Sequence, residues 1–217
     1  MVLIFANGDV ADVGWIRPYL PQAAAIIAAD GGARHLRALG RLPDVIVGDM
    51  DSVAPEELAR LAAAGVQVQR VPAAKDETDL ELALLYAVAH FPGEVLLFGA
   101  LGGRIDQTLG NIFLLAHPRL QGRRVQLLDA QQRVWLASAA DGEVRVNGRV
   151  GDLLSLLPCG GDAVVAQTSG LRWPLRQERL LFGPARGISN ELTAAEATLS
   201  IASGRLICVH TRGAWGR

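Results

Sequence analysis

The chain has 217 residues, half of them hydrophobic, so it can bury a sizeable core, and we expect two small domains rather than one large one. Its net charge is −1 with acids and bases interspersed, which argues against a nucleic-acid partner or an anionic membrane surface. No segment approaches the ~20 apolar residues that span a bilayer, and residues 1–5 lack a basic signal region, so we expect a cytoplasmic protein without a membrane partner.

Residues 1 to about 130 alternate between predicted strands and helices. The predicted strands are 2–5, 24–28, 45–47, 66–71 and 95–98, and the predicted helices are 33–39, 55–64, 79–90 and one that runs through 111 to about 116. Helix 79–90 has the clearest signal, because Thr78 and Glu81 form a capping box and apolar residues recur on one face. The alternation predicts an α/β domain with a doubly wound, mostly parallel sheet over residues 1–130.

The hydrophobic period changes at about residue 131. Apolar residues then alternate with period two, between turn signals such as Asn147-Gly148, Gly160-Gly161 and Ser203-Gly204. No long helix is predicted after Ala137. We therefore expect residues 131–217 to form an antiparallel β-sandwich or a small barrel.

Three short acidic segments stand beside predicted elements of the first half: Asp30-Gly31-Gly32, Gly48-Asp49-Met50-Asp51-Ser52 and Lys75-Asp76-Glu77-Thr78-Asp79. Asp49 and Asp51 follow a predicted strand and, two residues apart, can face the same way. Open α/β sheets bind their ligands at this edge, and Mg²⁺ commonly joins carboxylates to nucleotide phosphates. The sequence therefore predicts an enzyme that uses Mg²⁺ and a nucleotide.

Two further residues beside these elements have two interpretations each. Lys75, the single lysine of the chain, suits a phosphate because it stands among carboxylates, or it is an exposed residue that only aids solubility. Asn7, after the first predicted strand, belongs to a nucleotide-binding loop or to a plain Asn-Gly turn. The sequence contains no P-loop, dinucleotide fingerprint or calcium loop, so phosphates must be held in another way.

Six motifs, taken in order along the chain, resemble the thiamin pyrophosphokinase (thiamine diphosphokinase) family. They are Asp30-Gly31-Gly32-Ala33, Gly48-Asp49-Met50-Asp51-Ser52, Lys75-Asp76-x-Thr78-Asp79, Gly102-Gly103-Arg104-x-Asp106-Gln107, Gly170-Leu171-Arg172-Trp173-Pro174-Leu175 and Gly187-Ile188-Ser189-Asn190-Glu191. The resemblance implies an ATP- and Mg²⁺-binding α/β domain over 1–130 and a thiamine-binding β-sandwich over 131–217. It also implies a homodimer that binds thiamine between subunits, and transfer of the diphosphoryl group of ATP to the hydroxyl of thiamine, giving thiamine diphosphate and AMP.

The resemblance also implies roles for residues of the first half. The catalytic set it implies is Asp49, Asp51, Asp79, Arg104 and Asp106, of which Asp49, Asp51 and Asp79 are assigned to Mg²⁺. Arg104 is expected on phosphate, and Asp106 near the metal or the attacking hydroxyl. The residues expected to contact the nucleotide, with Asn7 included from its place after the first strand, are Asn7, Asp30, Gly31, Lys75, Asp76, Thr78, Arg104 and Gln107. Many relatives carry His where this chain has Gln107, so no general-base role is assigned there.

In the second half, the resemblance implies a thiamine site at Trp173, Ser189 and Asn190. An indole face suits a cationic thiazolium or an aminopyrimidine ring, with an attraction of roughly 0.5 to 2 kcal/mol. Ser189 and Asn190 are expected to hydrogen-bond the aminopyrimidine. The alternatives are a core tryptophan and a polar turn before the next strand.

Two other functions remain compatible with the sequence. The first is a diphosphokinase for another hydroxymethyl heterocycle, such as a pterin, because the same phosphate machinery would serve it. The second is a non-catalytic dimer that binds thiamine or a nucleotide. The acidic residues Asp49, Asp51, Asp76 and Asp79 favour an enzyme, because a sensor has no need to keep them.

Overall fold

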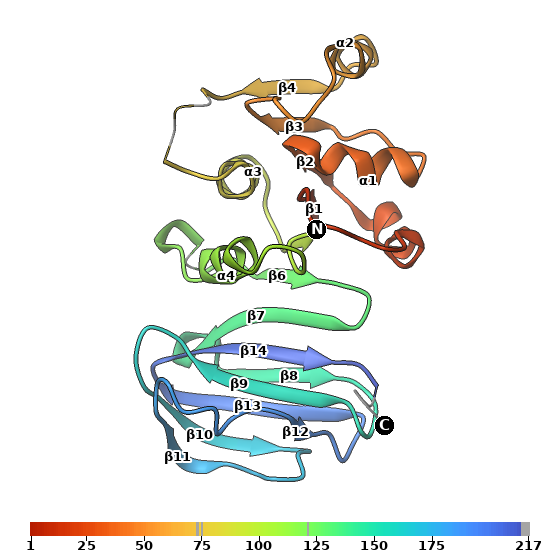
Figure 1. The fold of residues 1–217 in the computed structure, drawn as a ribbon. Coiled ribbons are helices and arrows are strands. Elements are labelled where there is room, and N and C mark those ends of the chain that lie inside the picture. The colour runs from red at the N-terminus through yellow and green to blue at the C-terminus, as the bar shows by residue number, and fades with distance from the viewer. Residues whose placement is uncertain (73, 75, 121, 214–217) are drawn as a thin grey trace. The chain divides into compact units, whose positions relative to one another are not determined.

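Two compact units make up the chain, Met1–Ala130 and Gln131–Arg217. The structure is a computed structural model that describes residues 1–72, 74, 76–120 and 122–213 (Figure 1). The first unit is an α/β domain and the second is an antiparallel β-sandwich, which confirms the predicted fold class. Among the described residues, no helix has the length and apolar character needed to cross a membrane.

A parallel sheet with the strand order β6-β5-β1-β2-β3-β4 organises the first unit. Its strands are β1 (Val2–Phe5), β2 (Ala25–Ala29), β3 (Val45–Gly48), β4 (Gln67–Arg70), β5 (Val95–Phe98) and β6 (Val125–Leu128). The chain adds β2, β3 and β4 on one side of β1, and β5 and β6 on the other. The strand order therefore reverses between β1 and β5, and ligands of such sheets bind at the carboxyl ends of the strands beside such a reversal.

Helices cover both faces of this sheet, as a doubly wound fold requires (Figure 1). One face packs against the 3-10 segment Gly14–Gln22 and against α1 (Ala33–Ala38) and α2 (Pro55–Ala63), which bury Leu36, Leu58 and Leu61. On the other face, α3 (Asp79–His90) contacts β1, β2, β3 and β5, and α4 (Ile105–Leu114) packs on α3. The bounds of α3 agree with those of the predicted helix 79–90. The helix begins at Asp79 because Thr78 is its N-cap residue and accepts a hydrogen bond from the Glu81 N–H.

Several elements of the structure are not predicted by the hydrophobic pattern, among them Gly14–Gln22, β6 and β11. The segment Gly14–Gln22 contains Pro18 and Pro21, so it has no α-helical signature and folds as a 3-10 helix. Strand β6 has only four residues, and β11 (Arg176–Leu180) is rich in charged residues because it lies at the edge of its sheet. Short or charged strands do not show the alternation on which the prediction depends.

The second unit consists of two antiparallel sheets with the strand orders β12-β9-β14-β7 and β11-β10-β13-β8. Besides β11, its strands are β7 (Gln132–Ser138), β8 (Glu143–Asn147), β9 (Leu153–Pro158), β10 (Ala163–Ser169), β12 (Asn190–Glu191), β13 (Glu196–Ser203) and β14 (Arg205–Thr211). Their inward side chains, such as Leu154 and Cys208 from one sheet and Val165 and Leu199 from the other, form one core. This is the layered packing of a β-sandwich rather than a barrel.

Candidate functional site

Three carboxylates meet at one end of the parallel sheet of the first unit. Asp30 follows β2 and begins a 3-10 turn, Asp49 follows β3, and Asp79 is the first residue of α3. One oxygen from each lies within 4.8 Å of the other two. A Cβ at Gly48 would lie 2.9 Å from the Asp30 Cβ and 3.2 Å from Asp79 Oδ1, so a side chain there would push the acidic cluster apart. The glycine after β3 thus allows the three carboxylates to meet.

Asp30 is the buried member of this cluster, with 4 % of its surface exposed. Its Oδ1 is buried and has no hydrogen-bond partner among the described residues. Burial raises the pKa of the Asp30 carboxyl; a hydrogen bond with Ser52 and another with the Gly31 N–H oppose this rise, and the charges of Asp79 and Asp51 add to it. A buried acceptor without a donor costs about 1–3 kcal/mol. A cation bound by the three carboxylates would remove this penalty.

Asp51 lies outside the acidic cluster. It is exposed, its N–H donates to Asp49 Oδ1 at 3.1 Å, and its Oδ1 accepts from the Ser52 hydroxyl at 3.0 Å. The intervening Met50 is buried with φ 68°, so Asp49 and Asp51 do not share a face as residues of an extended strand would. The structure therefore brings Asp30 to the place expected for Asp51, whose metal role stays a prediction.

Backbone strain is concentrated in the motif segments. Among the described non-glycine residues, those with positive φ are Asp30 (44°), Met50 (68°), Gln177 (47°) and Ser189 (61°). Each such residue costs about 1–3 kcal/mol and persists only where the surrounding structure holds it. Asp30, Met50 and Ser189 belong to segments that the sequence marks as functional. Their strained backbone supports a binding role for the segments around Asp30 and Met50 in the first unit and around Ser189 in the second.

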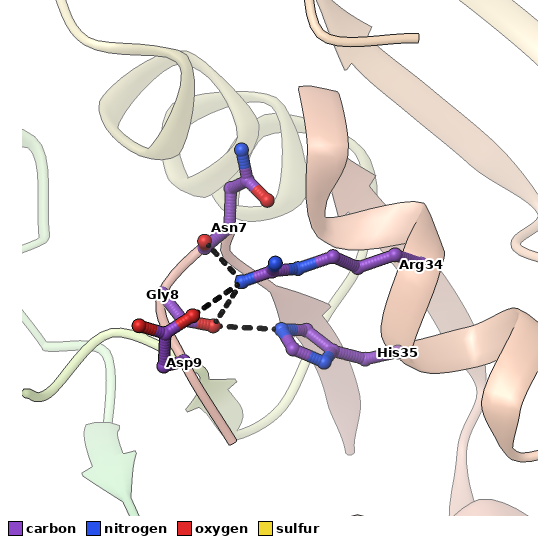
Figure 2. A network of polar contacts seen from close by, with 5 residues as sticks. All are labelled: Asn7, Gly8, Asp9, Arg34 and His35. Carbon is purple, nitrogen blue, oxygen red and sulfur yellow. Dashed lines mark hydrogen bonds and ion pairs between the residues drawn. The ribbon is translucent and has the colours of Figure 1, made fainter. Parts of the chain in front are cut away.

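The loop after β1 lies beside the acidic cluster. A Cβ at Gly31 would lie 2.5 Å from Nδ2 of Asn7, so the Asn7 side chain rests on the glycine that follows Asp30. Polar contacts from α1 hold this loop, as Figure 2 shows. Asn7 and Gly31 are therefore close to one another, as expected of two residues of one nucleotide site.

The segment before α3 is only partly described. Asp76 and Thr78 are exposed, and Thr78 Oγ1 accepts the Glu81 N–H at 3.2 Å, so this oxygen already caps the helix. The prediction for Lys75 lies outside the described residues. Only Asp79 of this segment belongs to the acidic cluster among the described residues.

Arg104 and Asp106 form an exposed ion pair at the start of α4. Arg104 Nε donates to Asp106 Oδ1 at 3.1 Å and Nη2 donates to Oδ2 at 2.5 Å, while the Gln107 N–H also donates to Oδ1, at 2.9 Å. The hydrogen bond from Arg104 and that from the Gln107 N–H hold the pKa of Asp106 below its usual range. Asp106 is therefore ionised at neutral pH, and an incoming phosphate must compete with it for Arg104.

Trp173 is exposed in the second unit, with 58 % of its surface accessible, so it is not a core residue. Its backbone is held by Asn190: the Trp173 N–H donates to Asn190 Oδ1 at 3.0 Å, and Asn190 Nδ2 donates to the Trp173 carbonyl at 2.6 Å. The Arg172 guanidinium carbon lies 5.7 Å from the centroid of the indole ring. Asn190 is buried, whereas Ser189 is exposed with its N–H bound to Ser155 Oγ at 3.0 Å. Asn190 thus presents the indole from within the sandwich.

Comparisons with known proteins match both units. The family "Thiamin pyrophosphokinase, catalytic domain" matches residues 16–127, and "Thiamin pyrophosphokinase, vitamin B1 binding domain" matches residues 143–206. Thiamine pyrophosphokinase from Bacillus subtilis is 30% identical over 208 residues, which cover 96% of this chain and 97% of that protein. Thiamine pyrophosphokinase 1 from Oryza sativa is 31% identical over 74% of this chain, which spans 62% of that longer relative.

Solved structures show the same relationship. The crystal structure of the thiamine pyrophosphokinase from Bacillus subtilis superposes with a TM-score of 0.86 at 29% identity, covering 98% of this chain and 99% of that one. The thiamin pyrophosphokinase from Candida albicans superposes with a TM-score of 0.82 at 17% identity, covering 98% of this chain and 88% of that one, and this likeness concerns the fold alone.

Proposed function

The chain belongs to the thiamin pyrophosphokinase family, and we propose that it transfers the diphosphoryl group of ATP to the hydroxyl of thiamine, giving thiamine diphosphate and AMP. One observation carries this proposal: the region matched to the catalytic domain contains the cluster of Asp30, Asp49 and Asp79, and the vitamin B1 binding region contains the exposed Trp173. We assign ATP to residues 1–130 and thiamine to residues 131–217.

For this reaction the protein must position the two substrates in line and supply positive charge that stabilises the phosphate oxygens. The hydroxyl oxygen of thiamine forms a bond to the β-phosphorus of ATP, the bond from that phosphorus to the oxygen shared with the α-phosphorus breaks, and AMP leaves. The hydroxyl loses its proton, which is proposed to pass to solvent or to Asp106 once Arg104 has exchanged that carboxylate for phosphate, since the hydrogen bond from Arg104 is the largest cause of the low pKa of Asp106. No nucleophile from the protein is needed, since phosphoryl transfer of this kind depends on in-line placement and on electrostatic stabilisation.

The chemistry of the acidic cluster suits Mg²⁺, which prefers hard oxygen ligands. The unpartnered Oδ1 of Asp30 and the nearby oxygens of Asp49 and Asp79 support these three residues as the ones that hold the ion, with Asp51 at the exposed edge of the site. When bound, Mg²⁺ withdraws charge from the phosphate oxygens. Our proposal therefore has Asp30, in place of the predicted Asp51, as the third metal ligand beside Asp49 and Asp79.

Other residues of the first unit are proposed to bind the nucleotide. Arg104, on exchanging Asp106 for phosphate, can form the bidentate contact that suits a guanidinium. The Gln107 N–H in the first turn of α4, which donates to Asp106 Oδ1 at 2.9 Å, is a second donor that could turn to a phosphate, because the start of a helix favours an anion. Asp76, Thr78 and Lys75 stay predicted contacts from the segment before α3.

Trp173 is proposed to stack on thiamine, and its reciprocal hydrogen bonds with Asn190 support a different, positioning role for Asn190. Asn190 holds the backbone of Trp173, so it acts on thiamine through the indole. Ser189, exposed and strained, is the better candidate for a direct hydrogen bond to the aminopyrimidine.

A homodimer is also part of the proposal. Ile105, Leu109 and Phe113 lie four residues apart on α4, and all three are exposed. Residues at this spacing share one face of a helix, and a row of exposed apolar side chains marks an interaction surface. We assign this α4 stripe to contact with a second copy of the chain. The cytoplasmic location stays a prediction of the sequence.

The function is tested by incubating the purified protein with ATP, Mg²⁺ and thiamine and measuring AMP and thiamine diphosphate together. Equal amounts of both products, dependent on Mg²⁺, are the expected result. ADP with thiamine monophosphate would exclude diphosphoryl transfer. Product from a hydroxymethylpterin in preference to thiamine would establish the other diphosphokinase, and thiamine binding without any product would establish a binding protein.

A further inference from the structure

His35 and Arg34 of α1 hold the loop after β1 through a set of polar contacts that Figure 2 shows together. His35 Nε2 lies 2.8 Å from the Gly8 carbonyl oxygen. Arg34 Nη2 donates to the Asn7 carbonyl at 2.8 Å and to the Gly8 carbonyl at 2.9 Å, and it pairs with Asp9 Oδ1 at 3.2 Å. Two consecutive residues of one helix therefore bind three consecutive residues of this loop.

This loop stands where the strand order of the sheet reverses. The Gly8 N–H donates to the Gly99 carbonyl at 2.9 Å, which joins the loop after β1 to the loop after β5. A Cβ at Gly99 would lie 3.3 Å from His35 Nε2 and 2.6 Å from the Ala6 carbonyl oxygen. His35 thus occupies the point where both loops meet, which is the place at which open α/β sheets bind ligands.

His35 is well suited to a fixed role in this place. It is 5 % exposed, and its burial, the largest influence on it, lowers the pKa of the ring, while hydrogen bonding to Gly8 opposes this. The neutral imidazole has one N–H, and the Gly8 carbonyl selects the tautomer that carries it on Nε2. Arg34 is more exposed, with 44 % of its side chain accessible, and its contact to the Asn7 carbonyl orients the residue that rests on Gly31.

We propose that His35 and Arg34 are positioning residues of the nucleotide site, which set the Asn7–Gly8 backbone so that the Asn7 side chain lies on Gly31 beside the acidic cluster. This inference rests on the proposed function, because it assigns the loop to ATP. It adds two residues that act through Asn7 and do not themselves contact the nucleotide. Their loss should weaken ATP binding without changing thiamine binding.

The test compares His35→Leu, which removes the donor, with His35→Gln, whose amide N–H can reach the same carbonyl. Steady-state kinetics should give a KM for ATP that is raised about tenfold in His35→Leu, with the KM for thiamine unchanged and kcat within about twofold. His35→Gln should recover most of the loss. Arg37→Gln, on an exposed position of the same helix, is the matched control.

Arg34→Gln provides a second measurement, because its exposed position keeps the fold intact if His35→Leu does not fold. It should raise the dissociation constant for ATP, measured by calorimetry, and the effect should vanish in an Asn7→Ala background, since residues that act through one another are not additive. An unchanged ATP affinity in folded Arg34→Gln, or an additive effect with Asn7→Ala, overturns the inference. Because calorimetry measures ATP binding without turnover, failure of the proposed reaction would be seen separately in the product assay.

Discussion

Replacement of Asp30 by Asn should stabilise the metal-free protein and abolish its response to Mg²⁺. The three carboxylates of the acidic cluster lie within 4.8 Å of one another. Two unit charges at that distance repel by about 0.9 kcal/mol in bulk water and about 3.5 kcal/mol at an effective dielectric constant of about 20. The amide side chain of Asp30→Asn would remove this repulsion and could donate its N–H to a neighbouring carboxylate. We expect a gain of about 1–3 kcal/mol in the free energy of unfolding, or roughly 2–4 °C per kcal/mol in Tm.

The assay for this prediction is thermal unfolding with EDTA and with Mg²⁺. A ligand at a hundred times its dissociation constant stabilises the native state by about 2.7 kcal/mol, so the wild type should melt higher with Mg²⁺ and Asp30→Asn should not. Turnover should be lost in the same variant. Glu77→Gln, an exposed acid on the segment before α3, is the control and should behave like the wild type.

Asp51→Asn separates the two candidates for the third metal ligand. Because Asp51 is exposed, its replacement should leave the Tm in EDTA unchanged. If Asp51→Asn eliminates the Mg²⁺-dependent rise in Tm while Asp30→Asn keeps it, the assignment of Asp30 to the metal is refuted.

Three further predictions concern other parts of the molecule. Trp173→Ala should raise the KM for thiamine roughly 2- to 30-fold. Asn190→Ala should raise this KM little further in the Trp173→Ala background, because Asn190 holds the backbone of Trp173. If the effects of the two substitutions on the KM are fully additive, Asn190 contacts thiamine itself. Leu109→Asp in the α4 stripe should shift the protein towards a monomer in analytical ultracentrifugation, and an unchanged mass would place the interface elsewhere. Burial, opposed by a hydrogen bond to Asp152, lowers the pKa of His210 below 6.5, so the unfolded chain takes up a proton at a higher pH than the folded protein does, and the free energy of unfolding should fall as pH drops from about 6.5 through the folded pKa. Urea unfolding of the wild type and of His210→Gln at pH 7.5 and 5.5 checks this. An equal change in the free energy of unfolding between the two pH values in both proteins would contradict it.

The hydrophobic pattern predicts the elements whose signals are local. The period of 3.6 and the Thr78 cap define α3, and the β-branched and leucine runs define β1, β3 and β5, because burial on both faces of a parallel sheet leaves continuous apolar segments. The change to period two at about residue 131 likewise predicts the second unit. The 3-10 segment after β1 and the short strands have no such signal.

The members of the acidic cluster depend on topology, which the pattern does not contain. Asp30 joins Asp49 because β2 and β3 are neighbours in the sheet, and it is buried at the start of a 3-10 turn, where its φ is 44°. Asp51 leaves the cluster because Met50 adopts φ 68°, a conformation that a spacing argument based on an extended chain does not include. His35 is found only when the loops after β1 and β5 are placed side by side. A single histidine in a short helix has no spacing that marks it.

The unfavourable features of the first unit lie together at the carboxyl edge of its sheet. The unpartnered Oδ1 of Asp30, the mutual repulsion of the carboxylates and the positive φ of Asp30 and Met50 each oppose folding, by about 1–3 kcal/mol apiece. If this edge served packing alone, an apolar or amide side chain at these positions would remove both the unpartnered oxygen and the repulsion between carboxylates. A bound cation relieves the same two and leaves the strained backbone in place as part of the site. Mg²⁺ binding, if it occurs at this cluster as proposed, should therefore raise the stability of the first unit above that of its metal-free form, and we expect this gain to depend on the burial of Asp30 rather than on the number of acids in the segment.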